Sequence, residues 1–368
     1  MDKSHKRVLI TGTTGAIGSW HVLELLNRGY EVICLVRGNH NHGRFEKLAS
    51  VIGESLASQV RIISGEITEN LAGVSTPVIE SLKGNVDIII HHAGSILFDQ
   101  EYWEDIMHTN VGGTTNVLAL AEVLGVPKFC YDSTAYALNT PPRNPYEESK
   151  QKAEEMVLNW DKGEVMIWRP SVVVGRASDG QTHGFNGYYG FFGGFNYLKF
   201  QLRHRWNESQ ENSRKQGFEF DNDDNLVLHH NLFIDYSQES TLNLVPVDWL
   251  VKSMTDLMEK ASWGRAYNLA DANPKRIAWI FERTFEILGI KGVKDNIQRK
   301  NYIEDASQTI LSNWQSGLDQ RLLRYRCYVM EENQFSCDVV DGPPTVDEYF
   351  LRTMLNYAIG ERFGHKRR

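Results

Sequence analysis

Cysteine is scarce in this chain of 368 residues, which has only Cys34, Cys130, Cys327 and Cys337. No two of them have the CxxC spacing of a zinc site or a redox motif, and four cysteines cannot frame a disulfide-rich fold of this length. We therefore predict reduced structural thiols, no metal site and a cytoplasmic location.

Long apolar runs and blocks of basic charge are also missing. No apolar stretch reaches the length of a transmembrane helix, and the opening MDKSHKR passes directly into a predicted strand, which leaves no room for a signal peptide. The 39 Lys and Arg against 47 Asp and Glu give a net charge of −8 without a basic block. The sequence therefore excludes a membrane span and a nucleic-acid partner.

Glycine is plentiful, and its spacing near the N-terminus is informative. Residues 8–18 read VLITGTTGAIG, and apolar positions at helical spacing follow in residues 19–26. In such a strand, turn and helix, Gly12 permits a tight bend, Gly15 the approach of a pyrophosphate and Gly18 close packing, while the helix N-terminus attracts phosphate. The turn predicts a dinucleotide site that includes Gly12, Thr14, Gly15, Ala16 and Ile17; the alternative is a turn that binds nothing.

The residue after the second predicted strand, residues 31–36, bears on the type of cofactor. NAD-binding folds usually place an acidic residue there, which accepts from the ribose hydroxyls. This chain has Arg37 instead, with Arg44 one loop later. Guanidinium groups match the charge and acceptors of a 2′-phosphate, so we predict NADP(H) as the cofactor. The alternative is a pair of solvated surface arginines.

Further apolar stretches at residues 60–64, 86–90, 128–131, 165–168 and 266–270 alternate with helical patterns. This alternation predicts an α/β fold, a Rossmann-type doubly wound parallel sheet with right-handed crossovers. We interpret His91 and His92, at the end of the fourth strand, as packing or capping side chains. The ends of the strands and the next helix supply further predicted cofactor contacts, namely Glu66, Ile67, Ala93, Gly94, Asn110, Pro170 and Ser171.

The composition changes after residue 175 and predicts two domains. Residues 1–175 with 241–270 form the predicted dinucleotide-binding Rossmann domain, and residues 176–240 with 271–368 form a smaller, mostly helical substrate-binding lobe. Residues 184–197 read GFNGYYGFFGGFNY, which offers apolar surface for an acyl chain. Lys199, Arg203, His204 and Arg205 add positive charge that suits a phosphate; the alternative is a packing lobe with an aromatic core.

A helix predicted after the fifth strand carries a tyrosine and a lysine on one face. Asn144 suits its N-cap, Pro145 its first position and Glu147 a capping box, which places Tyr146 and Lys150 four residues apart. A lysine there can lower the pKa of the phenol and bind the nicotinamide ribose. A Tyr-x-x-x-Lys pair is frequent by chance, so its placement after the fifth strand carries the argument.

These features together resemble the extended short-chain dehydrogenase/reductases, from about residue 7 to about residue 270. The resemblance rests on the glycine turn, residues 110–114, Ser133-Thr134, Tyr146 with Lys150, and Arg169-Pro170. Within that superfamily the chain is most similar to the thioester-reductase and fatty acyl-CoA reductase branch, which is male-sterility-like. The stretches that indicate this branch are residues 35–38 with Arg44, residues 144–150 and residues 244–248. One departure is Glu66, where the family usually carries Asp.

The resemblance implies a catalytic set of Thr134, Tyr146 and Lys150, with Ser133 as the alternative hydroxyl donor. Tyr146 would protonate the carbonyl oxygen, Thr134 would donate a second hydrogen bond and Lys150 would hold the ribose. The implied activity is NADPH-dependent reduction of an acyl thioester, bound to coenzyme A or a carrier protein, to an aldehyde or further to an alcohol. Alternatives are a carbonyl reductase, a sugar-nucleotide epimerase or dehydratase, and a non-catalytic NADP-binding module. The acyl group, its carrier and the oligomeric state stay open.

Overall fold

A computed structural model describes residues 6–38, 46, 48–50, 52–296 and 310–364. The chain forms two compact units. The first comprises Met1–Val173, Val245–Ala272 and Phe335–Pro344, and the second comprises Val174–Leu244, Asn273–Gln334 and Thr345–Arg368.

The first unit is built on a parallel sheet of seven strands in the order β12-β6-β5-β4-β1-β2-β3. This sheet confirms the predicted α/β, Rossmann-type doubly wound fold. Its apolar strands are continuous in sequence because both faces of the sheet are covered. The strands are β1 (Arg7–Thr11), β2 (Glu31–Val36), β3 (Arg61–Ser64), β4 (Ile88–His91), β5 (Lys128–Asp132), β6 (Glu164–Pro170) and β12 (Arg265–Leu269).

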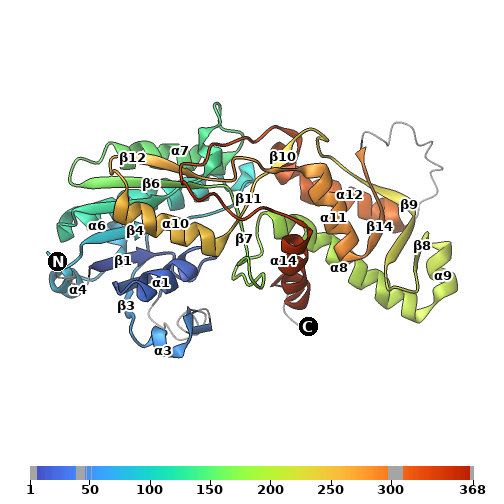
Figure 1. The fold of residues 1–368 in the computed structure, drawn as a ribbon, viewed down its shortest axis with the longest axis horizontal. Helices are drawn as coiled ribbons and strands as arrows, with labels where there is room; N and C mark the ends of the chain where they lie inside the picture. Colours follow the sequence, from blue (N-terminus) through green and yellow to red (C-terminus); the bar gives the residue numbers. More distant parts are fainter. Residues whose placement is uncertain (1–5, 39–45, 47, 51, 297–309, 365–368) are drawn as a thin grey trace. The chain divides into compact units, whose positions relative to one another are not determined.

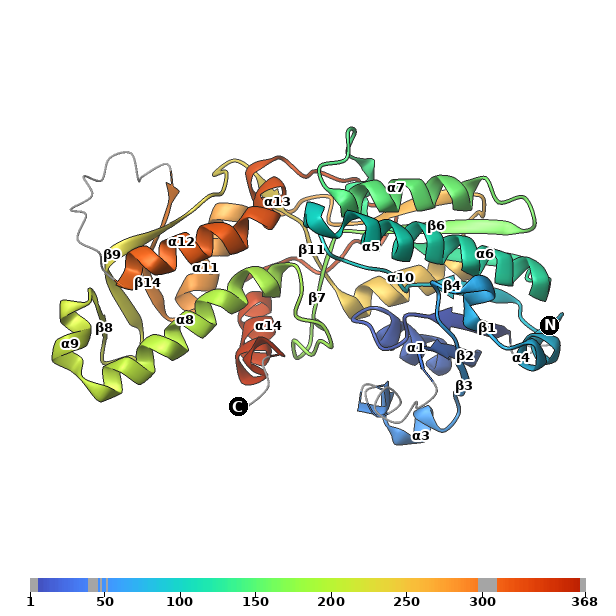
Figure 2. The same ribbon diagram turned by 180° about the vertical axis from the view of Figure 1, so that it is seen from behind.

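Helices cover both faces of this sheet, as Figures 1 and 2 show. Successive side chains of a strand point to opposite faces, so Leu9 packs with α4, α6 and α7, whereas Ile10 packs with α1 and α10. The helices of the first unit are α1 (Gly18–Asn27), α3 (Glu54–Ala57), α4 (Thr76–Leu82), α5 (Trp103–Met107), α6 (Gly113–Leu124), α7 (Pro145–Leu158) and α10 (Val247–Lys260), with short turns at Asn70–Gly73, Gln100–Tyr102, His108–Gly112 and Ala135–Leu138.

The direction of strand order reverses between β1 and β4. From β1 the sheet grows through β2 and β3 on one side and through β4, β5 and β6 on the other. In open α/β sheets, ligands bind outside the carboxyl ends of the strands at such a reversal. The glycine-rich turn after β1 and the polar residues after β4 and β5 therefore lie at the edge where a cofactor binds.

The second unit contains a three-stranded sheet in the order β14-β9-β8, a two-stranded pair of β10 and β13, and helices. The strands are β8 (Phe218–Phe220), β9 (Leu226–Ile234), β10 (Thr241–Leu242), β13 (Lys275–Arg276) and β14 (Ile290–Asp295). The helices are α8 (Tyr188–Glu208), α9 (Gln210–Lys215), α11 (Ile277–Leu288), α12 (Ile310–Leu322), α13 (Arg326–Met330) and α14 (Glu348–Gly360), with turns at Leu323–Tyr325 and Arg362–Gly364. Two short strands, β7 (Val172–Val174) and β11 (Leu244–Pro246), lie where the chain passes between units.

A late segment, Phe335–Pro344, returns to the first unit, although the sequence division placed it with the second. The backbone N–H of Asn268 donates to Asp338 Oδ2 (2.8 Å), and Asp338 N–H donates to the Asn268 carbonyl (3.0 Å). Trp249 Nε1 donates to the Asp341 carbonyl at 2.8 Å. These bonds hold the segment beside β12. Local sequence patterns cannot reveal such a contact between distant parts of the chain.

Within the described ranges, the longest helices are too polar or too short to cross a lipid bilayer. The same ranges hold no group of three or more His, Cys, Asp and Glu side chains arranged to bind a metal ion.

Candidate active site

The glycine turn between β1 and α1 lies tightly against the end of β4. Gly12 has a φ of +71°, and a Cβ on it would lie 2.6 Å from the backbone nitrogen of Ala93. A Cβ on Gly18 would collide with the Gly12 carbonyl. Gly15 closes the turn by donating to the Gly12 carbonyl at 2.9 Å and is itself exposed. The N-cap of α1, Ile17, makes no side-chain cap bond, so the first N–H groups of the helix have no side-chain cap. The other predicted contacts of the turn, Thr14, Ala16 and Ile17, are partly exposed.

An ion pair occupies the place where the adenosine end of a cofactor is predicted. After β2, Arg37 Nε lies 2.6 Å from Oε2 of Glu66, which follows β3. The Arg37 side chain is 58% exposed and that of Glu66 23%. Arg37 is predicted from the sequence to bind a 2′-phosphate, but in the structure its guanidinium already pairs with the Glu66 carboxylate. Ile67 is buried beside Gly113, and Arg44 lies outside the described residues.

The end of β4 is close to α7. A Cβ on Gly94 would lie 3.0 Å from Asn110 Oδ1 and 3.6 Å from Lys150 Nζ. Asn110, in a π-helical turn, donates from Nδ2 to Ser149 Oγ at 2.8 Å. The small residues Ala93 and Gly94, Asn110 and Lys150 are therefore brought together around one narrow space.

Helix α7 begins as the sequence predicts. Asn144 is its N-cap and accepts from the Glu147 backbone N–H at 3.0 Å, with Pro145 in the first turn. The Glu147 carboxylate also binds Arg143: it accepts from the Arg143 backbone N–H (3.0 Å) and pairs with its guanidinium (2.6 Å). This fully buried carboxylate fixes the segment that leads into Tyr146.

The Thr134 hydroxyl lies close enough to the Tyr146 hydroxyl to affect its pKa. Burial of the Tyr146 hydroxyl raises its pKa, and the negative charges of Asp132 and Glu147 raise it further, whereas the interaction with Thr134 lowers it. The net shift is upward, and Lys150 is not among its causes. A phenol in this state is protonated at neutral pH and able to donate.

The Lys150 ammonium points to a main-chain carbonyl. Its Nζ donates to the Asp132 carbonyl at 2.7 Å and lies 4.9 Å from the centre of the Tyr131 ring. Burial lowers the pKa of Lys150, and the charges of Asp132 and Glu154 oppose that shift. Lys150 is held beside Tyr146 but is not directed at its hydroxyl in this structure.

The hydroxyl groups after β5 differ in how firmly they are fixed. Thr134 Oγ1 donates to the Pro170 carbonyl and accepts from the Tyr136 backbone N–H, both at 3.4 Å. Ser133 Oγ is buried without a hydrogen-bond partner among the described residues. Ser171 follows β6 and donates from its backbone N–H to a neighbouring strand. Of the two candidate donors, Thr134 is the one that reaches Tyr146.

Two histidines that the sequence analysis interpreted as packing residues make specific bonds behind this site. His91 Nδ1 lies 2.7 Å from Thr11 Oγ1, and burial lowers the pKa of His91 to about 3. His92 Nδ1 lies 2.8 Å from Asp132 Oδ2, and His92 Nε2 lies 2.8 Å from Nδ1 of His21. No motif joins His21, His92 and Asp132, which come from three separate elements, so only the fold reveals the cluster.

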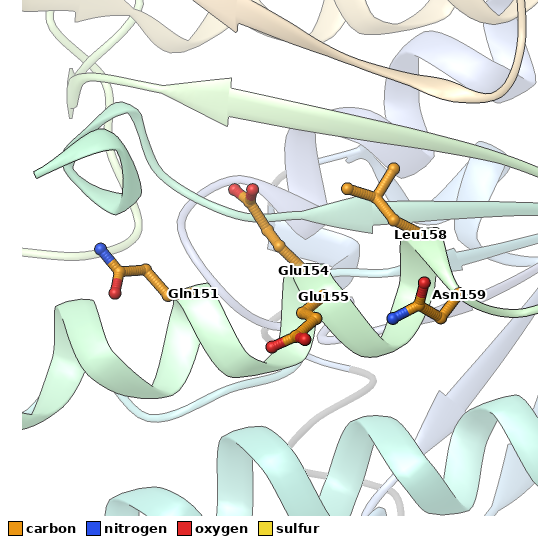
Figure 3. A pocket seen from close by; sticks show the side chains of 5 residues that line it. All are labelled: Gln151, Glu154, Glu155, Leu158 and Asn159. Atoms are coloured by element: carbon orange, nitrogen blue, oxygen red, sulfur yellow. The ribbon is translucent and has the colours of Figure 1, made fainter. Parts of the chain in front are cut away.

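A shallow pocket of about 370 Å³ lies along α7, away from these groups. Figure 3 shows its lining side chains along the helix, Gln151, Glu154, Glu155, Leu158 and Asn159. Glu154 accepts from Arg169 Nε at 2.9 Å. None of the predicted catalytic or cofactor residues lines this pocket.

The aromatic stretch at residues 184–197 is predicted to bind an acyl chain. In the structure, its buried rings instead form the core of the second unit. Phe192 is fully buried, with its ring centre 5.0 Å from that of Phe281 and 5.4 Å from that of Phe285. Tyr188, Tyr189, Phe191 and Phe195 are likewise buried. These side chains therefore agree with the alternative interpretation, in which the aromatic residues form a packed core and do not bind a ligand.

The basic residues of α8 are mostly engaged within the second unit. Arg203 pairs with Asp224 and lies 3.6 Å from the centre of the Phe220 ring. Lys199 Nζ donates to a main-chain carbonyl at 2.9 Å, and His204 lies 3.3 Å from Glu208. Arg205 is exposed. The predicted phosphate-binding cluster is therefore not assembled as a group.

Comparison with known sequences identifies related proteins. Residues 10–143 and 137–254 match the family model described as male sterility protein. L-2-aminoadipate reductase of Saccharomyces cerevisiae is 30% identical over 138 residues, 34% of this chain and 10% of the yeast protein. A UDP-glucose 4-epimerase of Klebsiella pneumoniae is 28% identical over 149 residues, 39% of this chain and 99% of the bacterial sequence. The chain thus matches a tenth of the length of the yeast relative.

Solved structures share the fold across nearly the whole chain. The terminal R domain of the myxalamid PKS-NRPS pathway aligns with a TM-score of 0.74 and 20% identity, covering 99% of this chain and 92% of the domain. A thiolation-reductase di-domain from an archaeal non-ribosomal peptide synthetase aligns with a TM-score of 0.68 and 18% identity, covering 97% of this chain and 76% of the other. At these identities the likeness establishes the architecture of both units.

Proposed function

Since the chain belongs to the male sterility protein family, a branch of the extended short-chain dehydrogenase/reductases, we propose that it is an NADP(H)-dependent reductase of acyl thioesters. The observation that carries the proposal is the grouping of Thr134, Tyr146 and Lys150, at the carboxyl edge of a sheet with a glycine turn. The resemblance to R domains of peptide and polyketide synthetases supports a carrier-bound thioester as substrate.

The described residues fit a dinucleotide. The glycine turn lets β1 pass tightly against the end of β4, where a side chain at Gly12 would collide with the backbone of Ala93, and the uncapped start of α1 faces the same edge. Gly12, Thr14, Gly15, Ala16 and Ile17 would hold the pyrophosphate. Arg37, Glu66 and Ile67 would meet the adenosine half, and Ala93, Gly94, Asn110, Lys150, Pro170 and Ser171 the nicotinamide half.

In the proposed reaction, a bound reduced nicotinamide supplies a hydride to the thioester carbonyl carbon. Tyr146, which its raised pKa keeps protonated, would then give its proton to the carbonyl oxygen. Thr134 would turn its hydroxyl from the Pro170 carbonyl to give the oxygen a second hydrogen bond as negative charge develops there. The hemithioacetal would break its C–S bond while its hydroxyl proton passes to the departing sulfur, which releases a thiol and an aldehyde. Reduction of that aldehyde to an alcohol would need a second equivalent of reduced cofactor and a proton.

The preference for NADP(H) is supported by Arg37, which lies 58% exposed at the end of β2. Its partner Glu66 competes for the guanidinium, so a 2′-phosphate has to displace Glu66 or share the guanidinium with it. A cytoplasmic location fits the four cysteines, all of which are free thiols in this structure.

A panel of acyl-coenzyme A and acyl-pantetheine thioesters tests the proposal. The expected result is NADPH oxidation, followed by absorbance, with release of one thiol per aldehyde, followed by a colorimetric thiol reagent. Reduction of simple ketones or aldehydes without thiol release from any thioester would replace the proposal by a carbonyl reductase.

The second candidate is a sugar-nucleotide epimerase or dehydratase, which the similarity to a UDP-glucose 4-epimerase supports. Enzymes of that kind commonly retain tightly held NAD, so identification of the cofactor in purified protein separates the two. Turnover of UDP-glucose with retained NAD would favour the epimerase. Binding of NADP(H) without turnover of either substrate class would favour a binding module.

A further inference from the structure

Four buried polar side chains of the first unit form a hydrogen-bonded chain that starts beside Lys150. Asp132 Oδ2 lies 2.8 Å from His92 Nδ1, and His92 Nε2 lies 2.8 Å from His21 Nδ1. His21 Nε2 lies 3.2 Å from Thr255 Oγ1 on α10. The exposed fractions are 0% for His21 and Thr255, and 2% and 8% for the side chains of His92 and Asp132.

The proton positions in this chain follow from its far end. The Thr255 hydroxyl has one hydrogen, which it donates to the Val251 carbonyl one helical turn earlier, at 2.8 Å. It can therefore only accept from His21, so His21 Nε2 carries a proton. Burial lowers the pKa of His21 far below its usual value, so its ring is neutral and its Nδ1 accepts. His92 Nε2 must then be a donor.

The proton positions of His92 and Asp132 follow by the same reasoning. Once His92 Nε2 carries a proton, a neutral ring leaves Nδ1 without one. A separation of 2.8 Å between Nδ1 and a carboxylate oxygen requires a proton between them. The pair therefore holds one proton more than a neutral imidazole and a carboxylate would. The Trp168 ring stacks on His92 with an interplanar angle of 21°, an arrangement that suits a charged imidazole.

We propose that Asp132 and His92 share this buried proton and act as a positioning pair for Lys150. The side chain of Asp132 is held by His92, and its main-chain carbonyl accepts from Lys150 Nζ at 2.7 Å. Because His92 fixes the carboxylate of Asp132, the main-chain carbonyl of Asp132 is also held in place, and this carbonyl positions Lys150. What Lys150 then does rests on the proposed function; the protonation of the pair does not.

Several charged or titratable groups surround the pair. His21 faces it from α1, His91 from β4, Tyr131 from β5, and Lys150 and Tyr146 from α7. The charge of Asp132 contributes to the raised pKa of Tyr146, after burial. Asp132 therefore adds to the effect of burial on Tyr146, while its main-chain carbonyl holds the neighbouring lysine.

Nitrogen NMR of histidine rings tests the protonation without substrate or cofactor. The protein is labelled with ring-¹⁵N histidine, and the signals of two of its 12 histidines are assigned with His92→Asn and His21→Asn. At about pH 8, where a free imidazole is neutral, we expect His92 to carry a proton on Nε2 and to share a second proton at Nδ1 with Asp132. A neutral His92 with its proton on Nδ1 alone would overturn the proposal. Either result stands even if no thioester is reduced.

Substitutions at His92 test the positioning role. Asn at this position keeps an amide N–H close to the place of Nδ1 and can still donate to Asp132, whereas Leu cannot. We expect His92→Leu to raise the dissociation constant of NADPH at least tenfold and His92→Asn about threefold or less, by fluorescence titration. Equal losses in both variants, with the fold intact by circular dichroism, would contradict a role in positioning Lys150.

Asp132→Asn tests the pair by nitrogen NMR of the His92 ring. A purely structural role of Asp132 would leave the protonation of that ring unchanged. The introduced amide can donate to His92 Nδ1, so the ring is expected to be neutral with a proton on Nε2 only. Without the carboxylate, the alkaline limb of kcat/KM should move to lower pH by on the order of one unit. Asp161→Asn, a fully exposed carboxylate paired with Lys162, is the control. An unmoved limb in Asp132→Asn would overturn the electrostatic part of the proposal.

Discussion

Arg37 and Glu66 face each other across the ends of β2 and β3, with 2.6 Å between Nε and Oε2. The sequence placed a cofactor phosphate at the arginine, and the structure shows a carboxylate already there. The pair joins two residues 29 positions apart, 66 minus 37. An exposed ion pair of this kind is weak, so a dianionic 2′-phosphate can compete for the guanidinium.

This relationship predicts opposite effects of two substitutions on cofactor affinity. Arg37→Ala should raise the dissociation constant of NADPH by roughly ten- to a hundredfold, because a charge-assisted phosphate contact contributes about 1.5–3 kcal/mol. Glu66→Gln should lower it, since the competing charge is removed. Titrations with NADPH and NADH measure both, and Arg61→Ala, an exposed arginine on β3, is the control. Equal affinity of the wild type for the two cofactors would contradict the NADP(H) assignment.

Tyr146→Phe should abolish most turnover while the fold is kept. Only a hydroxyl is lost, so NADPH binding should stay within about twofold, while the loss of a general acid lowers turnover by two to four orders of magnitude. Lys150→Ala should weaken NADPH binding as well. Steady-state kinetics with fluorescence titration separate these effects.

Tyr349→Phe, at a tyrosine that is 73% exposed on α14, controls for the loss of a phenol hydroxyl. Near-native turnover in Tyr146→Phe would show that the Tyr-x-x-x-Lys spacing is a chance match.

Acid should destabilise the protein through His91. Burial depresses its pKa from 6.5 to about 3, so between these values the unfolded chain binds a proton that the folded protein does not. The contribution of His91 to stability is thus complete above pH 6.5 and is lost as the pH falls toward 3, by about 1.4 kcal/mol per pH unit. His91→Asn, which can still bond to Thr11, should flatten the acid side of the stability curve in urea unfolding. An unchanged slope would argue that His91 is charged in the folded protein.

Phe192→Ala should destabilise the second unit by about 3–5 kcal/mol, because it opens a cavity in a core of packed rings. Phe200→Ala, on the same helix but 59% exposed, should change stability by roughly 0.5 kcal/mol or less. Chemical unfolding measures both. Similar small effects of the two substitutions would indicate that Phe192 has the freedom expected of a substrate-binding side chain.

The sequence predicted the sheet because each strand is a short apolar run bounded by turn residues, a signal carried within a few positions. The start of α7 was predictable for the same reason, since Asn144 and Pro145 are adjacent to the turn they stabilise. Glu147 shows where local reasoning ends, because the capping pattern does not reveal that its carboxylate also binds Arg143, four residues earlier.

Other features depend on contacts between distant residues. His21, His92 and Asp132 meet only because three elements converge, so their hydrogen bonds leave no pattern in the sequence. The aromatic residues of α8 carry an apolar signal that suits a core and a ligand site equally well, and only the positions of Phe281 and Phe285 decide between them. The sequence likewise supplies the hydroxyl groups of Thr134 and Tyr146, whereas their proximity requires the end of β5 to lie beside α7.

The attachment of Phe335–Pro344 beside β12 also bears on the order in which the chain matures during synthesis. All seven strands of the sheet have been synthesised by residue 272, but the segment that binds β12 ends at residue 344, which is 72 residues later, 344 minus 272. A nascent chain halted after residue 272 would hold all seven strands yet expose the edge of β12 that Asp338 covers. Unpaired strand edges invite aggregation, so this edge stays open to other chains until the late segment has been synthesised.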